Sequence, residues 1–211
     1  MADLTIPATF PAGEIVALNV SAEAYMEKYA ADHYEWAQGA VIKMSPVTQR
    51  HQKTVFYLTA LIDVYLEHNP IGLTIGKPFV MRLENAILEP DLQVILKRNP
   101  GDLTNTAMIG PADICIEVAT IESTPRDYGY AFKAYEDAGV REYWLIDPVR
   151  ATHTFYRVGD YRLYKRFDVD KDGFYESPVL PGFKLHVPTL WQDELPGIVE
   201  IVDSVKAMHT D

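Results

Sequence analysis

At the centre of the chain stands the stretch Asp113-Ile-Cys-Ile-Glu-Val118, which is the strongest indicator of the fold. It is short and rich in β-branched residues, and it lies between Gly110-Pro111 and the turn-forming residues 123–125. This pattern predicts a buried β-strand. Side chains alternate along a strand, so Asp113 and Glu117 are expected on the same face. A carboxylate buried in mid-strand is costly without a partner, and Glu117 therefore marks a candidate site.

A helix is predicted directly after this strand. Four residues signal its boundaries: the N-cap Thr124, Pro125 at the first helical position, Asp127 three residues after the cap, and Gly139 just past the end. The strand continues about 10 Å beyond Glu117 at roughly 3.3 Å per residue. From the start of the helix to Lys133 is also about 10 Å at roughly 1.5 Å per residue. If the helix folds back over the strand, Lys133 returns to the level of Glu117.

Two more strands complete the central pattern. Asp91 opens the segment Asp91–Leu96 and follows Pro90, which is tolerated at the first position of a strand but not inside one. Asp91 is therefore expected at the mouth of a strand, where a carboxylate can stay hydrated or hold a metal. The run Arg141-Glu-Tyr-Trp-Leu-Ile-Asp-Pro148 forms the next strand. The order strand, loop, strand, helix, strand predicts an α/β domain.

Further elements are expected around this centre. They are a helix over Ser21–Ala30, a hairpin of Tyr34–Trp36 and Val41–Met44 around Gln38-Gly39, a long helix from Ser45-Pro46 to about His68, strands Gly72–Ile75 and Phe79–Leu83, and a C-terminal hairpin of His153–Arg157 and Tyr161–Phe167. The tail Val205–Asp211 is expected to be frayed.

The composition limits the class of protein. A chain of 211 residues with 48% hydrophobic and 23% charged residues suits one globular domain. It has no apolar run of about 18 residues and no secretory leader pattern, so we expect a cytoplasmic protein that does not span a membrane. The single cysteine, Cys115, agrees with a reducing compartment. A net charge of −11 argues against a protein that coats nucleic acid, but it allows a compact nuclease with a local basic rim.

A spaced set of residues resembles a known family. The set comprises Pro90-Asp91, Pro111-Ala112-Asp113, Glu117-Val118, Lys133, Tyr135, Ala138-Gly139-Val140 and Glu142-Tyr-Trp-Leu-Ile-Asp-Pro148, with Tyr34-Glu35, Gly39, Met44-Ser45-Pro46 and His51 upstream and Leu180-Pro181-Gly182-Phe183 downstream. Over roughly residues 20–190 the chain resembles a large bacterial family of restriction endonuclease-like proteins. That family was long known as a domain of unknown function, and it is placed in the PD-(D/E)xK nuclease superfamily.

The resemblance implies one restriction-endonuclease-like domain over residues 1–211, with a mixed central β-sheet flanked by helices and a C-terminal β-hairpin extension. It also implies hydrolysis of DNA phosphodiester bonds. Asp91 and Glu117, with the backbone carbonyl of Val118, are expected to hold Mg²⁺, or alternatively Mn²⁺, because oxygen ligands suit hard cations. Lys133 would orient or deprotonate the attacking water, and Glu35 could help to bind the first or a second metal.

Two positions depart from the pattern. Ala119 stands two residues after Glu117, where the superfamily has lysine, so the lysine role passes to Lys133. Ala40 stands where the family often has a second glutamate, which leaves Glu35 as the carboxylate of that hairpin.

Each candidate also has a structural interpretation. Glu117 could form an ion pair with Lys133 or an arginine, and Asp91 could merely solvate the start of a strand. Lys133 could extend into solvent from the edge of the apolar helix face. Glu35 could be an exposed acid on a strand.

His51 and Asp113 are possible site-lining residues. The alternative for His51 is helix capping or packing, and the alternative for Asp113 is closure of the strand start.

Two other functions stay open. The fold could have lost its chemistry and serve as an interaction module, or it could hydrolyse a smaller phosphate ester with a metal. DNA is the expected partner of the nuclease, and a homodimer is expected because two-fold dimers are the commonest soluble assemblies.

Overall fold

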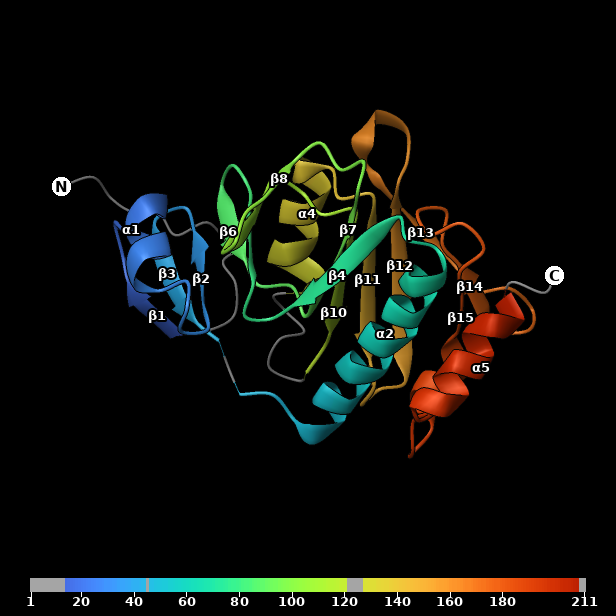
Figure 1. Cartoon of the computed structure of the whole chain (residues 1–211). Helices are drawn as coiled ribbons and strands as arrows, with labels where there is room; N and C mark the ends of the chain where they lie inside the picture. Colours follow the sequence, from blue (N-terminus) through green and yellow to red (C-terminus); the bar gives the residue numbers. More distant parts are fainter. Residues whose placement is uncertain (1–13, 45, 121–126, 209–211) are drawn as a thin grey trace.

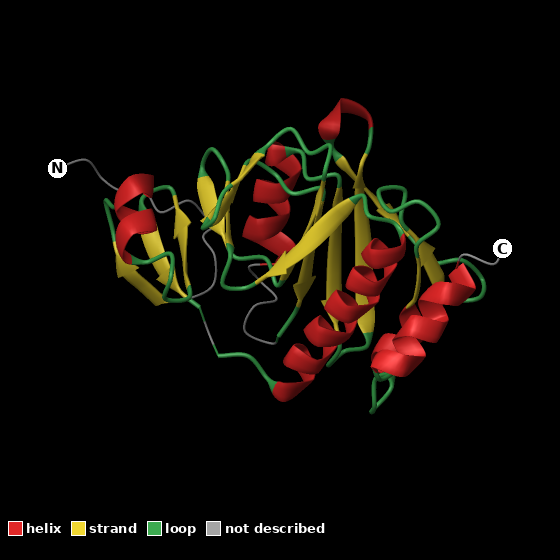
Figure 2. Ribbon diagram, viewed as in Figure 1, coloured by secondary structure: helices red, strands yellow, loops and turns green. Residues whose placement is uncertain are grey.

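The computed structural model describes residues 14–44, 46–120 and 127–208. The chain has a mixed α/β fold built on a six-stranded and a seven-stranded sheet (Figures 1 and 2). Within the described residues, no helix combines the length and the apolar character needed to cross a bilayer.

The central sheet has six strands in the order β13-β12-β11-β10-β7-β4. Their bounds are Gly72–Gly76 (β4), Leu92–Leu96 (β7), Ile114–Val118 (β10), Glu142–Asp147 (β11), Thr152–Val158 (β12) and Tyr164–Phe167 (β13). β10 and β11 are parallel, and the other neighbours are antiparallel. A parallel pair needs a crossover connection, which contains the π-helical turn η1 (Asp127–Ala131) and helix α4 (Phe132–Ala138). The predicted strand, helix, strand unit is confirmed.

Different helices cover the two faces of this sheet (Figure 2). Helix α2 (Gln49–His68) packs on the face that carries Ile116 and Val118. The face that carries Cys115 packs against Ala131 and Tyr135 of η1 and α4. The alternation predicted for the central strand is thus present, and it directs Glu117 towards α4.

The second sheet has the strand order β1-β3-β2-β6-β5-β9-β8. Its strands are β1 (Glu14–Ala17), β2 (Tyr34–Ala37), β3 (Ala40–Lys43), β5 (Val80–Arg82), β6 (Ala86–Leu88), β8 (Asp102–Leu103) and β9 (Ala107–Ile109), and helix α1 (Ala22–Lys28) packs beside it. Met81 and Leu88 of this sheet belong to the same hydrophobic core as Cys115 and Tyr143 of the central sheet. The two sheets therefore share a core.

Helix α2 begins later than the sequence pattern predicted. The hydroxyl of Thr48 accepts a hydrogen bond from the backbone N–H of His51 at 3.2 Å and caps a helix that starts at Gln49. A side-chain oxygen at the N-cap satisfies an amide that has no partner inside the helix, which is why the helix starts there and not at Pro46. Ser45 lies outside the described residues.

The helix predicted after the central strand ends as expected. Gly139 follows α4 with φ of 82°, a left-handed conformation that glycine adopts without a steric penalty. The predicted N-cap Thr124 and the following Pro125 lie outside the described residues.

The C-terminal region is more ordered than predicted. After η2 (Asp160–Arg162) in the β12–β13 turn come β14 (Phe174–Glu176), β15 (Lys184–His186), η3 (Val187–Trp191) and helix α5 (Ile198–Met208). Ile201 and Val205 of α5 are fully buried in the core that α2 also contacts. The predicted fraying from Val205 is therefore wrong up to Met208, because this segment buries an apolar helix face.

Candidate active site

Three ionisable residues lie in one row at the end of β4 (Lys77), at the start of β7 (Asp91) and in β10 (Glu117), three adjacent strands of the central sheet. Gly76, the last residue of β4, pairs with Leu92, the first residue of β7. On its other side, Leu92 pairs with Ile116 of β10. Both ladders are antiparallel. One residue further along each ladder, Lys77 lies opposite Asp91 on the β4 side, and Glu117 lies opposite it on the β10 side. The sheet register therefore places one ammonium and two carboxylates together.

Asp91 is almost completely buried, and its carboxylate contacts three groups. Oδ2 accepts a hydrogen bond from the backbone N–H of Val118 at 2.7 Å and lies 3.0 Å from Nε2 of His51. Oδ1 lies 2.8 Å from Nζ of Lys77. Burial favours the neutral acid, but the charge of Lys77 and the contacts with His51 outweigh it and hold the pKa of Asp91 well below its ordinary value. Asp91 is thus an ionised carboxylate in a buried position.

Glu117 lies inside β10 and is 1% exposed. Its Oε1 accepts a hydrogen bond from the hydroxyl of Tyr135 on α4 at 2.7 Å. Burial, followed by the charges of Glu117 and Asp113, raises the pKa of the Cys115 thiol well above its usual value. The hydrogen bond from Tyr135 shows that Glu117 faces the α4 side of the sheet, and it fixes the orientation of the carboxylate.

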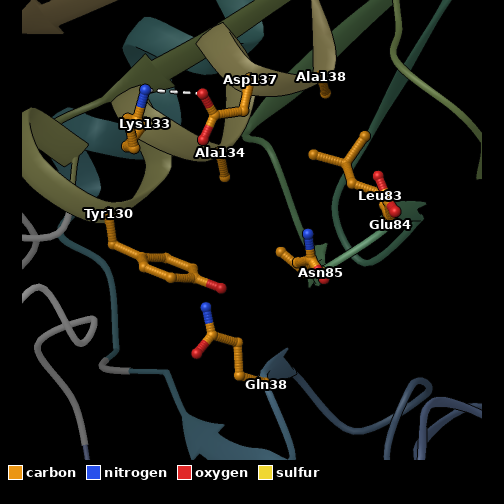
Figure 3. A pocket seen from close by; sticks show the side chains of 10 residues that line it. Gln38, Leu83, Glu84, Asn85, Tyr130, Lys133, Ala134, Asp137 and Ala138 are labelled. Carbon is orange, nitrogen blue, oxygen red and sulfur yellow. Dashed lines mark ion pairs between the residues drawn. The ribbon is translucent and has the colours of Figure 1, made fainter. Parts of the chain in front are cut away.

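Lys133 does not approach Glu117, contrary to the prediction. Its side chain is 57% exposed, and Nζ lies 2.7 Å from Asp137 and 3.2 Å from Glu136 on the same helix. Figure 3 shows the ammonium turned towards Asp137. Hydrogen bonds with Asp137 and Glu136 raise the pKa of Lys133. The geometry of the helix explains the difference: Tyr135 faces Glu117, and a residue two positions away points about 200° around the axis, given 3.6 residues per turn.

Lys133 instead lines a cavity of about 200 Å³ between α4 and two turns of the second sheet. Gln38 and Asn85 line the same cavity, and the hydroxyl of Tyr130 points towards the amide of Gln38 (Figure 3). Burial and then the charge of Glu35 raise the pKa of Tyr130. The cavity therefore lies close to the buried carboxylate of the β2–β3 hairpin.

Glu35 is buried, so its interpretation as an exposed strand residue is wrong. Its Oε1 accepts a hydrogen bond from the backbone N–H of Glu89 at 3.0 Å. Glu89 is also buried, and its Oε2 lies 2.8 Å from Nδ1 of His33. Since Glu89 precedes Asp91 by two residues, these contacts tie the hairpin carboxylate to the segment that enters the row.

His51 lies beside Asp91. It is 3% exposed and contacts Asp91 through Nε2. Within the described residues, its Nδ1 is buried without a hydrogen-bond partner. His51 thus fixes the orientation of Asp91 from the α2 side.

Asp113 has a different role. Its Oδ2 accepts hydrogen bonds from the backbone N–H of Leu96 at 2.9 Å and from Asn99 at 2.8 Å, and its Oδ1 lies 3.2 Å from Arg141. It precedes Glu117 by four residues, about 13 Å along an extended strand. Asp113 closes the start of the strand and does not belong to the row.

A model of the Uma2 family, described as "Putative restriction endonuclease", matches residues 22–188. The chain belongs to the Uma2 family. Among solved structures, it is similar to one described as "a putative nuclease belonging to DUF820 from Anabaena variabilis ATCC 29413". That similarity has a TM-score of 0.64 and 18% sequence identity, and it covers 75% of this chain and 89% of the other. At this identity the likeness shows a shared fold. No curated protein matches the chain.

The Uma2 assignment implies a divalent cation, and the row can be tested for one. Within residues 14–44, 46–120 and 127–208, no group of three or more His, Cys, Asp or Glu side chains could hold a metal. The row supplies the carboxylates of Asp91 and Glu117. Mg²⁺ commonly uses one or two protein carboxylates and completes its octahedral shell with water. Carboxylate oxygens are the donor type that a hard divalent ion prefers, and Oδ1 of Asp91 faces the Lys77 ammonium in this structure.

Sequence reasoning missed three residues of this region. Tyr135 was named among the residues that resemble the family but was given no role in the site, and Glu89 and Lys77 were not singled out. The available signal for Lys77 was its place two residues after a predicted strand, but only the register with β7 shows that it flanks Asp91.

Proposed function

We propose that this Uma2 protein is a metal-dependent endonuclease that hydrolyses phosphodiester bonds of DNA. The observation that supports this best is a pair of buried carboxylates: Glu117 in β10, and Asp91, which accepts a hydrogen bond from the backbone N–H of Val118, the residue after Glu117. Burying two carboxylates weakens the fold, because removing charge from water is costly. Their presence here therefore favours a functional role.

Asp91 and Glu117, with the carbonyl of Val118, would hold Mg²⁺ or Mn²⁺. When bound, the ion supplies a water with a lowered pKa and neutralises charge on the phosphate. His51 and the backbone N–H of Val118 orient Asp91, and Tyr135 orients Glu117. In the reaction, an oxygen of water bonds to phosphorus, one ester P–O bond breaks, and the departing oxygen takes up a proton.

Glu35 supports the site from the hairpin. Its carboxylate binds the backbone at Glu89, so it fixes the path of the chain into Asp91. We propose that it contributes a carboxylate to the first or a second cation, as in two-metal hydrolysis.

The experiment compares Asp91→Asn and Glu117→Gln with Asp137→Asn, an exposed carboxylate on α4 that serves as the matched control. Supercoiled plasmid is incubated with Mg²⁺ or Mn²⁺, and metal uptake is measured by calorimetry. We expect the wild type and the control to bind metal and nick the plasmid, and both site variants to lose each property. Retention of metal binding and cleavage in either site variant would remove that residue from the proposal.

A second function has one observation in its favour. The exposed position of Lys133 removes the lysine expected from the sequence, which is what a nuclease fold reduced to an interaction module would show. That module would bind DNA or protein but neither take up metal nor cleave. A hydrolase of a smaller phosphate ester, compatible with the net charge of −11, would take up metal and turn over bis(p-nitrophenyl) phosphate without nicking plasmid.

We further propose that the protein is cytoplasmic and acts as a homodimer, since a DNA duplex presents two strands to a two-fold symmetric enzyme. Light scattering at tens of micromolar measures the mass. A monomeric mass with and without duplex DNA would contradict the dimer.

A further inference from the structure

The backbone around Lys77 is fixed against β7. Gly76, the last residue of β4, lies so close to β7 that an added Cβ would come within 3.0 Å of the carbonyl oxygen of Asp91. After Lys77 the chain turns, and the carbonyl of Phe79 accepts a hydrogen bond from the side chain of Gln93 at 2.8 Å. The turn is therefore tied to β7 on both sides of Lys77, and its side chain starts from a defined position.

The ammonium of Lys77 is directed into the site. Nζ lies 2.8 Å from Oδ1 of Asp91, and the side chain is 19% exposed. Lysine carries a long and mobile chain that normally extends into water, and holding it beside a buried acid costs desolvation and side-chain entropy. The remaining exposure shows that the Lys77 side chain is not sealed off from solvent.

The two lysines differ in what surrounds them. Lys133 is 57% exposed and pairs with acids of its own helix, as a surface lysine does. Lys77 comes from a strand neighbouring β7 and lies in the row with Asp91 and Glu117. An active-site lysine needs an ammonium beside the carboxylates, and Lys77 meets this condition whereas Lys133 does not.

We infer that Lys77 is the catalytic lysine of this site and that it takes the role expected of Lys133. The inference rests on the proposed phosphodiester hydrolysis. Before substrate binds, Lys77 neutralises Asp91. With DNA bound, its ammonium contacts a non-bridging oxygen of the scissile phosphate and stabilises the negative charge that develops as the water oxygen bonds to phosphorus and the ester P–O bond breaks. Lys77 stays protonated throughout and transfers no proton.

The test replaces Lys77 by cysteine and then restores an ammonium. Treatment with 2-bromoethylamine converts an accessible cysteine into S-aminoethylcysteine, in which the thiolate displaces bromide and the new side chain ends in an ammonium. The natural thiol, Cys115, is fully buried and has a raised pKa, so the reagent is directed to position 77. Lys133→Cys is the matched control, since it also removes one lysine and accepts the same treatment.

We expect Lys77→Cys to cleave plasmid about 10²- to 10³-fold more slowly than the wild type, as for loss of one group that stabilises transition-state charge. Aminoethylation should restore most of the rate. Lys133→Cys should cleave like the wild type before and after treatment. Recovery on aminoethylation shows that the lost rate came from the missing ammonium and not from misfolding. Wild-type rates in Lys77→Cys, or a slow variant that aminoethylation does not restore, would overturn the inference.

Metal binding supplies a readout independent of cleavage. Calorimetry with Mn²⁺ should give Lys77→Met an affinity equal to or above that of the wild type, because a competing cation has left Asp91. A lower affinity would show that Lys77 only organises the carboxylate and would also overturn the inference. The two proposals can be refuted separately. If the wild type does not cleave DNA, both the endonuclease activity and the role of Lys77 are refuted. If the wild type cleaves and Lys77→Cys cleaves equally well, only the role of Lys77 is refuted.

Discussion

Replacement of Asp91 by alanine tests how strongly the row is coupled. The change removes the acceptor for the backbone N–H of Val118, the counter-charge for Lys77 and the partner of Nε2 of His51. Removing one partner of a buried ion pair costs about 3–5 kcal/mol, because the other charge stays buried. We expect a loss of this size in the free energy of unfolding. A stability of roughly 5–15 kcal/mol is usual for a domain, so Asp91→Ala should still fold.

A double-mutant cycle separates the ion pair from other effects of the substitution. Lys77→Met alone leaves the Asp91 carboxylate with His51 and Val118, and we expect it to destabilise by about 2–3 kcal/mol. In Asp91→Ala/Lys77→Met both charges are gone, so the double variant should be more stable than the sum of the single losses predicts, by at least about 1 kcal/mol.

The assay is urea denaturation followed by tryptophan fluorescence and circular dichroism, in metal-free buffer. The matched control is the cycle of Asp137→Ala and Lys133→Ala, an exposed pair on α4 whose coupling should lie below about 0.5 kcal/mol. If the losses at Asp91 and Lys77 simply add, the 2.8 Å contact between them has no energetic role, and our account of the row is refuted.

The remaining predictions concern side chains that support the row or the fold. Tyr135→Phe deletes the hydrogen bond to Glu117 and should cost about 1.5–3 kcal/mol of stability, measured by urea denaturation. Glu142→Ala removes a fully buried carboxylate that accepts four hydrogen bonds, and should lower the free energy of unfolding by about 3 kcal/mol or more in the same assay. Burial and then the charge of Arg166 lower the pKa of His153, against the opposing effect of Asp168. The neutral imidazole is therefore favoured by folding, and stability should fall as pH drops below about 6.5, the unfolded value. His153→Gln should flatten that decline in thermal melts between pH 5 and 7.

The central strands could be predicted because their signals are local. β-Branched residues between turn residues identify β10, and the proline before Asp91 marks the start of the next strand in the row. Period-two alternation then separates Glu117 from Ile116 without knowledge of any partner strand. Gly139 identified the end of α4 for the same reason, since a left-handed cap depends on one residue.

Lys133 shows where this reasoning fails. Its level along the helix axis relative to Glu117 was estimated from rise per residue, but contact also requires the correct direction around the axis. Tyr135 has that direction, and Lys133 points away from it. The apolar stripe of the helix already indicated which face meets the sheet, and a residue outside that stripe reaches solvent.

Lys77 shows a second limit. It lies 14 positions before Asp91 in the chain, and no local pattern fixes how two strands slide past each other. A shift of one residue in the β4–β7 register would turn every side chain of β4 to the opposite face. The same uncertainty hid Glu89, whose contact with Glu35 depends on where the β2–β3 hairpin lies against β6.

The row also links the stability of the fold to its proposed chemistry. Lys77 directly follows β4, Asp91 directly precedes β7, and Glu117 lies in β10, so their relative positions depend on the register of both the β4–β7 and the β7–β10 ladders. A substitution that shifts either ladder would separate the charges without touching them. Because an added Cβ at Gly76 would lie 3.0 Å from the carbonyl oxygen of Asp91, Gly76→Ala should shift β4 and Lys77 away from Asp91, while Asp91 keeps its contacts with His51 and Val118 and Glu117 keeps its contact with Tyr135. The position of the Lys77 ammonium therefore depends on the backbone as well as on its own side chain, and the close approach of β4 to β7 helps to set the geometry of the proposed site.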